Sequence, residues 1–328
     1  MTPARVLVTT DYLAPGDEVD LLLRDAGLTT RHLPMRGRRD PDELVAALAG
    51  VQGALIANEP MTADVLSRAP RLRAVVRTGV GYDSVDVDAA TRAGVSVSNL
   101  PGINAHAVAE YTMALLLAQA RRLVAVADGV AAGGWPREDG TELRGKVLGL
   151  IGFGATARAV VPLARAFGLT LLCATGVPAD QRDPEVRVVD LPELLAESDF
   201  VSVHTALTPA TRGLLDAAAL ARMKPTAHLV NTARGPIVDE AALADAVRTG
   251  RLAGAALDVT STEPLPADSP LRGVPGITVL SHLGGQTAEA RRAAGLEGAR
   301  ELVAALRGEP RHSLNAHLIT RPATEEQP

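Results

Sequence analysis

The segment GLIGFGATARAV, Gly149–Val160, decides how the chain folds. It opens with apolar residues, as a buried strand does, and then offers Gly152 and Gly154, with Ala157 three residues further on. The first glycine permits a tight turn, the second permits close approach to a pyrophosphate, and the third position needs only a small residue for helix–strand packing. The segment therefore predicts a strand, a Gly-rich turn and a helix whose N-terminus can receive phosphates. On these residues alone, a purely structural turn is an equal alternative.

Short strand-like runs alternate with helix-like runs on both sides of this segment. Before it, strands are expected at Arg5–Thr10, Gly53–Ala57, Arg73–Thr78 and Val95–Asn99, and helices at Asp17–Ala26, Met61–Ala69 and Val87–Gly94. From Lys146 onwards, strands are expected at Val147–Ile151, Thr170–Ala174, Phe200–His204, His228–Asn231, Gly254–Val259 and Ile277–Leu280, with a last helix over about 287–306. This alternation favours parallel sheets covered by helices on both faces. The length of 328 residues suits two such α/β domains.

One stretch between the two arrays, Asn104–Gly129, is predicted to be helical and has continuous apolar content. A helix that is apolar on more than one face is buried on more than one side. We therefore expect it, and its part Asn104–Arg122 in particular, at a domain junction or a subunit interface. The tail from Thr320 onwards is polar and is expected to be disordered.

Composition excludes several classes of protein. The net charge is −5 and no basic block stands out, which argues against a nucleic-acid partner. The single cysteine, Cys173, makes a disulfide framework impossible and suits a reducing compartment. No apolar run reaches the roughly 20 residues that span a bilayer, and the N-terminus lacks a signal-peptide pattern. A cytoplasmic protein without a membrane partner is expected.

Ionisable residues follow three predicted strands at their C-terminal ends, where parallel sheets place their sites. They are Arg234 in NTARG, Asp258 and Glu263 in LDVTSTEP, and His282 in SHLGG. Arginine can hold a carboxylate with two hydrogen bonds, and histidine can move a proton near neutral pH. A carboxylate beside a histidine orients the ring and favours its charged form. Each residue alone could also be a surface ion pair, a turn residue or a core histidine.

Taken together and in order, the motifs resemble the D-isomer-specific 2-hydroxyacid dehydrogenase family over roughly residues 1–317. They are RTGVGYDSVD (Arg77–Asp86), HAVAEYTMALLLA (His106–Ala118), ELRGKVLGLIGFG (Glu142–Gly154) and the three stretches above. The resemblance implies an NAD(P)-dependent oxidoreductase acting on a small D-2-hydroxy acid or 2-oxo acid, with no metal. It implies a flavodoxin-like substrate domain, 1–100 plus 287–328, and a Rossmann cofactor domain, 101–286, with the active site in the cleft between them.

The resemblance also implies a role for individual residues. Arg234 would bind the substrate carboxylate, and Glu263 would pair with the catalytic His282. Further substrate contacts would fall on Asn58, Thr78, Gly79, Val80 and Gly81. Cofactor contacts would fall on Thr112, Gly152, Gly154, Ala155, Thr156, Thr175, His204, Thr205, Thr232, Ala233, Asp258, Gly284 and Gly285.

Two departures from the family pattern bear on specificity. Thr175 stands where an acidic residue usually binds the adenosine ribose, and the nearest downstream cation is Arg182. NAD is therefore favoured and NADP is left open. The loop Ile56–Thr62 lacks the arginine of phosphoglycerate-acting members, so a substrate such as glyoxylate or hydroxypyruvate is favoured over 3-phosphoglycerate, although Arg77 could still serve a second anion.

The resemblance leaves one alternative of another class. Some relatives with this fold act as NADH-responsive co-repressors that bind peptides and carry extended tails, whereas this chain has only a short one. An enzyme that forms a homodimer through the helix Asn104–Arg122 is the favoured interpretation.

Overall fold

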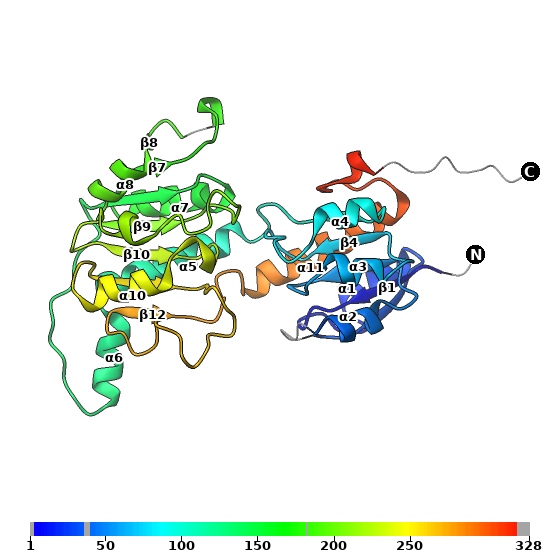
Figure 1. Ribbon diagram of the computed structural model, residues 1–328, viewed down its shortest axis with the longest axis horizontal. Helices are drawn as coiled ribbons and strands as arrows, with labels where there is room; N and C mark the ends of the chain where they lie inside the picture. The colour runs from blue at the N-terminus through cyan, green and yellow to red at the C-terminus, as the bar shows by residue number, and fades with distance from the viewer. Residues whose placement is uncertain (1–2, 36–39, 182, 320–328) are drawn as a thin grey trace, which may run out of the picture. The chain divides into compact units, whose positions relative to one another are not determined.

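The computed structural model describes residues 3–35, 40–181 and 183–319, and the chain divides into two compact units. The first unit runs to Asn104 and resumes at Thr287, and the second is Ala105–Gln286. Each unit has its own parallel sheet with helices on both faces (Figure 1). The predicted α/β class with two doubly wound sheets is therefore confirmed. The expected tail from Thr320 lies outside the described residues.

The first unit contains a five-stranded sheet in the order β2-β1-β3-β4-β5, the flavodoxin-like arrangement. Its strands are β1 Arg5–Val8, β2 Thr29–His32, β3 Gly53–Ile56, β4 Ala74–Arg77 and β5 Ser96–Ser98. Its helices are α1 Glu18–Asp25, α2 Pro41–Leu48, α3 Ala63–Ser67, α4 Val87–Arg92 and α11 Ala288–Arg307, followed by the short η3 Ala316–Leu318. One core lies between the sheet and α2, α3 and α4, and another lies between the sheet and α1 and α11.

Polar residues fix where these helices begin. Asp17, Asp40 and Asp86 accept backbone N–H groups at the starts of α1, α2 and α4, and Thr62 does so for α3. Such caps satisfy amide groups that the first helical turn leaves without a partner.

The second unit contains a seven-stranded sheet in the order β12-β11-β10-β9-β6-β7-β8. Its strands are β6 Val147–Ile151, β7 Thr170–Ala174, β8 Arg187–Val188, β9 Phe200–Val203, β10 His228–Asn231, β11 Gly254–Leu257 and β12 Ile277–Val279. Its helices are α5 Ala105–Ala120, α6 Leu123–Ala131, α7 Ala155–Ala166, α8 Leu191–Glu197, α9 Ala217–Leu220 and α10 Glu240–Arg248, with short η1 Ala179–Gln181 and η2 Gly235–Ile237. The strand order reverses between β6 and β9, which is where doubly wound sheets bind ligands.

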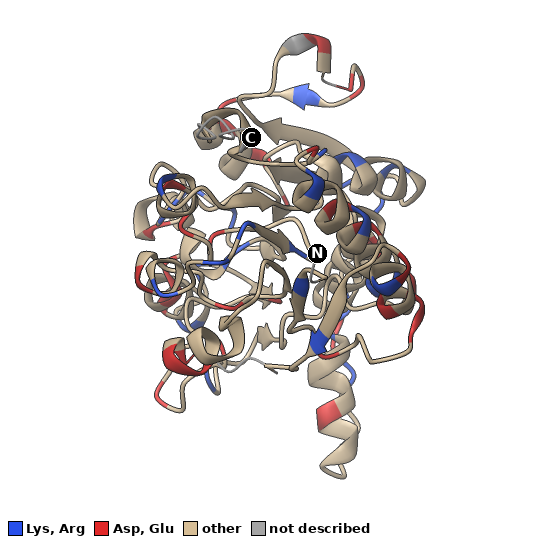
Figure 2. Cartoon of the chain, turned by 90° about the vertical axis from the view of Figure 1, so that its right-hand side faces the viewer, with Lys and Arg blue, Asp and Glu red and all other residues tan. Residues whose placement is uncertain are grey.

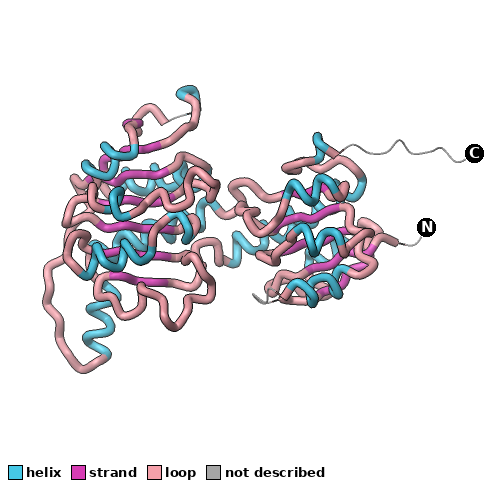
Figure 3. The backbone as a smooth tube through the Cα atoms, in the orientation of Figure 1, coloured by secondary structure: helices cyan, strands magenta, loops and turns pink. Residues whose placement is uncertain are grey.

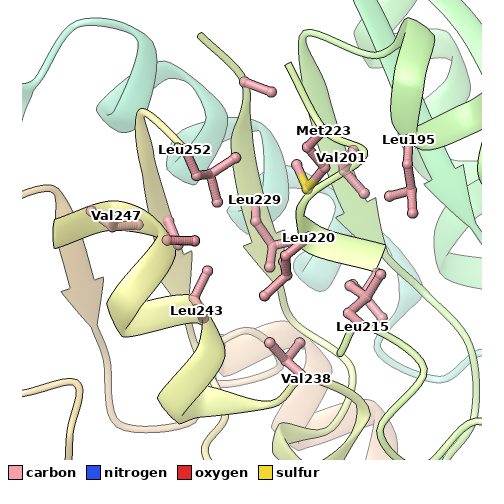
Figure 4. Close-up of a cluster of buried hydrophobic side chains, with 14 of the residues drawn as sticks. Leu195, Val201, Leu215, Leu220, Met223, Leu229, Val238, Leu243, Val247 and Leu252 are labelled. Carbon is pink, nitrogen blue, oxygen red and sulfur yellow. The ribbon is translucent and has the colours of Figure 1, made fainter. Parts of the chain in front are cut away.

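Alternate residues of these strands point to opposite faces, and each face has its own core. Helices α5 and α7 cover one face, where Leu148 and Leu150 of β6 are fully buried. Helices α8, α9 and α10 cover the other, and Figure 4 shows Leu220 and Leu243 packing near Leu229 of β10. Ala, Val and Leu fill both cores, as a chain with 2% aromatic residues requires.

The helical stretch expected over Asn104–Gly129 is interrupted, and its part Asn104–Arg122 corresponds to α5. It is two helices, because Arg122 adopts a left-handed backbone conformation with φ 52° between α5 and α6. Helix α5 packs on α7 within its own unit, whereas no residue of α6 is buried. Figure 3 shows α6 standing away from the strands of its unit, followed by a long loop that leads to β6.

Charged side chains of both signs are spread over the described part of the chain. Figure 2 shows Lys and Arg interspersed with Asp and Glu over the helices and loops. None of the helices in the described part of the chain is both long and apolar enough to cross a membrane.

Candidate active site

The Gly-rich turn between β6 and α7 has the geometry that its sequence predicts. Gly152 has φ 96°, and a Cβ atom there would lie 2.8 Å from the carbonyl oxygen of His204. Gly154 begins α7, and no heavy atom lies within 4 Å of the position its Cβ would take. Ala157 is fully buried against the sheet. The first turn of α7 carries no acidic residue, so its free N–H groups and dipole can receive an anion.

A cation that the motifs do not indicate, Arg158, lies close to this turn. Arg158, one helical turn beyond Gly154, donates a hydrogen bond of 3.2 Å to the carbonyl of Gln181 and lies over the Phe153 ring. Its side chain therefore reaches the segment that follows β7. Thr175, at the end of that strand, accepts a hydrogen bond of 3.1 Å from the Val177 amide. Arg182 lies outside the described residues.

Arg234 sits on a turn that Asn231 organises. The buried Asn231 amide accepts from the Ala233 N–H at 3.0 Å and donates to the Arg234 carbonyl at 2.9 Å. Gly235 follows, and a Cβ atom there would overlap the Thr260 carbonyl carbon. The turn that carries Arg234 is thus in backbone contact with the segment that leads to Glu263.

His282 and Glu263 form the pair that the motifs predict. Nδ1 of His282 lies 3.0 Å from Oε2 of Glu263, and the other carboxylate oxygen accepts from the Thr260 amide at 3.3 Å. Because the carboxylate accepts, Nδ1 carries the proton. Nε2 of His282 has no hydrogen-bond partner among the described residues, and it is the ring nitrogen that can exchange a proton with a ligand.

Asp258 fixes the loop that bears His282. Its carboxylate oxygens accept the amides of Leu283 at 2.7 Å and Gly284 at 2.8 Å, and its carbonyl accepts the His282 amide at 2.8 Å. His282 itself has φ 62°, a left-handed conformation that is unfavourable for a residue with a Cβ. The visible role of Asp258 is therefore to hold this loop, and its contact with a cofactor remains a prediction.

The remaining expected cofactor residues gather at the same edge of the seven-stranded sheet. Thr112 of α5 lies 3.3 Å from Thr232, oxygen to oxygen. Nε2 of His204 lies 2.9 Å from Ser202 Oγ, and burial lowers the pKa of His204 to about 4, so its ring is neutral. The others follow the strands or open α7: Ala155 and Thr156 on α7, Thr205 after β9, Ala233 after β10, and Gly285 after Gly284.

The expected substrate loop lies in the first unit, after β4. The amide of Thr78 donates to Ile56 and that of Gly79 donates to Arg77, so only Val80 and Gly81 keep N–H groups without a hydrogen bond among the described residues. The amides of Val80 and Gly81 are therefore the ones in this loop that can donate to a ligand.

Two side chains that the motifs leave unassigned also shape this loop. Asn99 donates a hydrogen bond of 2.6 Å to the Val80 carbonyl. The guanidinium of Arg77 donates to Asn58, and a Cβ at Gly79 would overlap it. Arg77 thus lies directly against the loop and engages the expected substrate residue Asn58.

Metal-binding chemistry has no support at these positions. Nowhere in the described ranges do three or more His, Cys, Asp or Glu side chains gather as ligands for an ion. The side chains above suit anion binding and proton transfer instead.

Known proteins resemble this chain over most of its length. Residues 113–284 match the family described as "D-isomer specific 2-hydroxyacid dehydrogenase, NAD binding domain". A D-3-phosphoglycerate dehydrogenase of Mycobacterium tuberculosis is 40% identical over 315 residues, which cover 93% of this chain and 57% of that protein. A glyoxylate reductase of Aeropyrum pernix is 36% identical and covers 97% of this chain and 98% of its own. The crystal structure of the TT0316 protein from Thermus thermophilus has a TM-score of 0.86 at 37% identity, covering 94% of this chain and 99% of its own.

The chain belongs to the D-isomer specific 2-hydroxyacid dehydrogenase family. It spans little more than half the length of the mycobacterial relative, and nearly the whole of the archaeal one.

Proposed function

We propose that the chain is an oxidoreductase that transfers a hydride between NAD and a small D-2-hydroxy acid or its 2-oxo acid. One observation carries the proposal. The paired His282 and Glu263, the turn of Arg234 and the Gly-rich turn at Gly152 all lie at the C-terminal edge of one parallel sheet. A proton donor, a carboxylate-binding cation and an anion-receiving helix N-terminus are what this reaction requires.

The second unit is the proposed cofactor-binding domain. The turn Gly152–Gly154 and the first turn of α7 would receive the pyrophosphate, since a Cβ at Gly154 would meet open space. The residues after β9, β10 and β12 would line the nicotinamide end. When bound, the cofactor supplies or accepts the hydride.

The side chains have distinct roles in the proposed reduction. Arg234 binds the substrate carboxylate and orients the carbonyl. Protonated His282 gives a proton from Nε2 to the carbonyl oxygen while the hydride adds to carbon. Glu263 holds the Nδ1 side of the ring and offsets the positive charge. Oxidation of the hydroxy acid uses the same groups in reverse order.

The first unit is the proposed substrate-binding domain, with Val80 and Gly81 as amide donors. A short substrate such as glyoxylate or hydroxypyruvate is favoured over 3-phosphoglycerate, because the loop after β3 itself contains Asn58 and no arginine, although Arg77 at the end of β4 could serve a second anion. Asn58 in turn accepts a hydrogen bond from Arg77. No observation favours the co-repressor alternative.

We also propose a cytoplasmic homodimer. The interface we expect is α6 with Trp135, rather than α5, because α5 packs within its own unit. Three apolar residues of α6 are at least 43% exposed, namely Leu123, Val124 and Val130, and Trp135 is 78% exposed. Contiguous exposed apolar surface is typical of protein interfaces, and a second copy makes the commonest one.

A panel of 2-oxo acids assayed with NADH tests the proposed activity. Arg234→Ala should lower kcat/KM on the best substrate, because the substrate carboxylate loses its charged partner. The expected loss of transition-state stabilisation is about 2–5 kcal/mol. Arg222→Ala, at an exposed position of the same unit, is the control and should stay close to wild type. Near wild-type kcat/KM for Arg234→Ala would refute the assignment.

A further inference from the structure

The loop that carries His282 is held from two sides. On one side, the two carboxylate oxygens of Asp258 accept the amides of Leu283 and Gly284 at 2.7 and 2.8 Å. On the other side lies α5. A Cβ atom at Gly284 would be 3.0 Å from Asp258 Oδ2, 3.5 Å from Cδ1 of Tyr111 and 3.7 Å from Val108 Cγ1. Gly284 therefore lies against both the Asp258 carboxylate and the Tyr111 ring, which leave no room for a side chain.

The hydroxyl group of Tyr111 is placed unusually for a core residue. Its oxygen is buried, and the Asp258 carboxylate is the group with which it interacts. Burial and the neighbouring Asp258 carboxylate raise the pKa of Tyr111 to about 12, so the phenol keeps its proton at neutral pH. The Asp258 carboxylate is the acceptor towards which this donor is directed, since hydrogen bonding to Asp258 is one of the causes of the raised pKa. The one anionic group that influences this hydroxyl is Asp258.

We propose that Tyr111 is a positioning residue that holds the loop 282–285, through its ring on Gly284 and its hydroxyl beside Asp258. The loop needs such support because His282 has φ 62°, a conformation that persists only where surrounding contacts impose it. The proposal rests on the proposed function for its consequence, since a proton donor displaced by about 1 Å can lose about a hundredfold in rate.

The competing explanation is that Tyr111 merely fills the core between α5 and the sheet. Its ring does contact that core, as Leu117 of the same helix also does. The two explanations differ in one respect. Core filling predicts that any loosening of α5 affects the loop, whereas positioning predicts that only changes at Tyr111 do so.

Amide hydrogen exchange of the protein without ligands separates them, and it does not depend on activity. Tyr111→Leu should make the amides of Leu283 and Gly284 exchange about tenfold faster, the effect of losing one tertiary contact. Tyr111→Phe keeps the ring and should give an intermediate rate. The control Leu117→Ala removes a similar core contact and should leave these two amides at the wild-type rate.

The same variants are then compared in NADH affinity and in kcat. Tyr111→Phe should lower kcat about tenfold or more while the Kd for NADH changes less than about threefold. Wild-type exchange at Leu283 and Gly284 in both Tyr111 variants would overturn the proposal, as would equal acceleration in Leu117→Ala. If the wild-type protein reduces no 2-oxo acid, the proposed function fails, while the exchange result still decides the role of Tyr111.

Discussion

Nδ1 of His282 and Oε2 of Glu263 lie 3.0 Å apart, and both side chains are partly exposed to solvent. The imidazole is thus held at Nδ1 and accessible at Nε2, which suits a proton donor.

His282→Ala should lower kcat about 10²–10⁴-fold, the usual contribution of a general acid, with NADH affinity retained. Glu263→Gln keeps the shape but removes the charge, so kcat should fall by less. Stopped-flow and equilibrium binding measure both quantities. Loss of NADH binding in His282→Ala would indicate a structural role.

Gly235 has no side chain, and this allows the backbones of two parts of the candidate site to touch. A Cβ there would overlap the Thr260 carbonyl carbon, so Gly235→Ala must push the Arg234 turn away from the segment that leads to Glu263. We expect a loss of about 3 kcal/mol in unfolding free energy, together with a large loss of activity. Gly176→Ala is the control, because a Cβ there meets no atom within 4 Å. Denaturant titration gives the comparison, and equal stability of both variants would contradict the close backbone contact between Gly235 and Thr260.

The exposed apolar residues of α6 make the proposed dimer testable. Val124→Asp should give a monomer with wild-type thermal stability of the subunit, because the side chain is exposed and its loss leaves no cavity. Leu21→Asp, at an exposed apolar position of α1, is the matched control and should remain dimeric. Sedimentation at micromolar concentration distinguishes the outcomes. A wild-type monomer at that concentration would rule the dimer out.

Asp20 stabilises the first unit in a pH-dependent way. Burial of this carboxyl group raises its pKa, but hydrogen bonds from Thr30, the Gly16 amide and His32 outweigh burial and lower the pKa to about 2. The ionised form is therefore favoured by folding. Its contribution is present above the unfolded pKa near 4 and is lost as the pH falls towards 2.

Asp20→Asn should accordingly cost about 2 kcal/mol at neutral pH, and the difference from wild type should vanish near pH 2. Urea titrations between about pH 7 and pH 2 measure it. A difference that does not depend on pH would mean that the loss arises from packing and not from the charge.

The Gly-rich turn and most strands could be predicted, because each depends on residues that are close together in the sequence. Gly152 with Gly154 determines a turn through φ and steric access, and strand periodicity determines the sheets. The break at Arg122 was not predicted, since the residues around it are good helix formers and nothing in the local sequence indicates the left-handed conformation of Arg122. The support of His282 by Tyr111 was equally invisible, because it joins residues about 170 positions apart that carry no shared motif.

We expect the selectivity between NAD and NADP to depend on the contacts that Thr175 and Arg158 make with the adenosine ribose. Thr175 supplies no carboxylate, and its hydroxyl already accepts a hydrogen bond from Val177. A carboxylate at that position would both bind the ribose diol and repel a 2′-phosphate. Arg158 and Arg165 are described cations whose side chains reach the segment after β7. Arg158 donates to the Gln181 carbonyl, and Arg165 donates to Asp183.

With neither a carboxylate nor a dedicated phosphate partner, selectivity should stay below about a hundredfold, or under ~3 kcal/mol, with NAD favoured. Thr175→Asp should lower KM for NADH and raise it for NADPH, because the new charge acts oppositely on the two ribose groups. Arg158→Gln should weaken NADPH more than NADH, since a cation next to the 2′-phosphate has no equivalent role with a free hydroxyl. Steady-state kinetics with both cofactors on the three proteins decide the matter. A wild-type preference for NADPH of about a thousandfold would contradict the argument from Thr175 and would assign the phosphate to Arg158 or another cation.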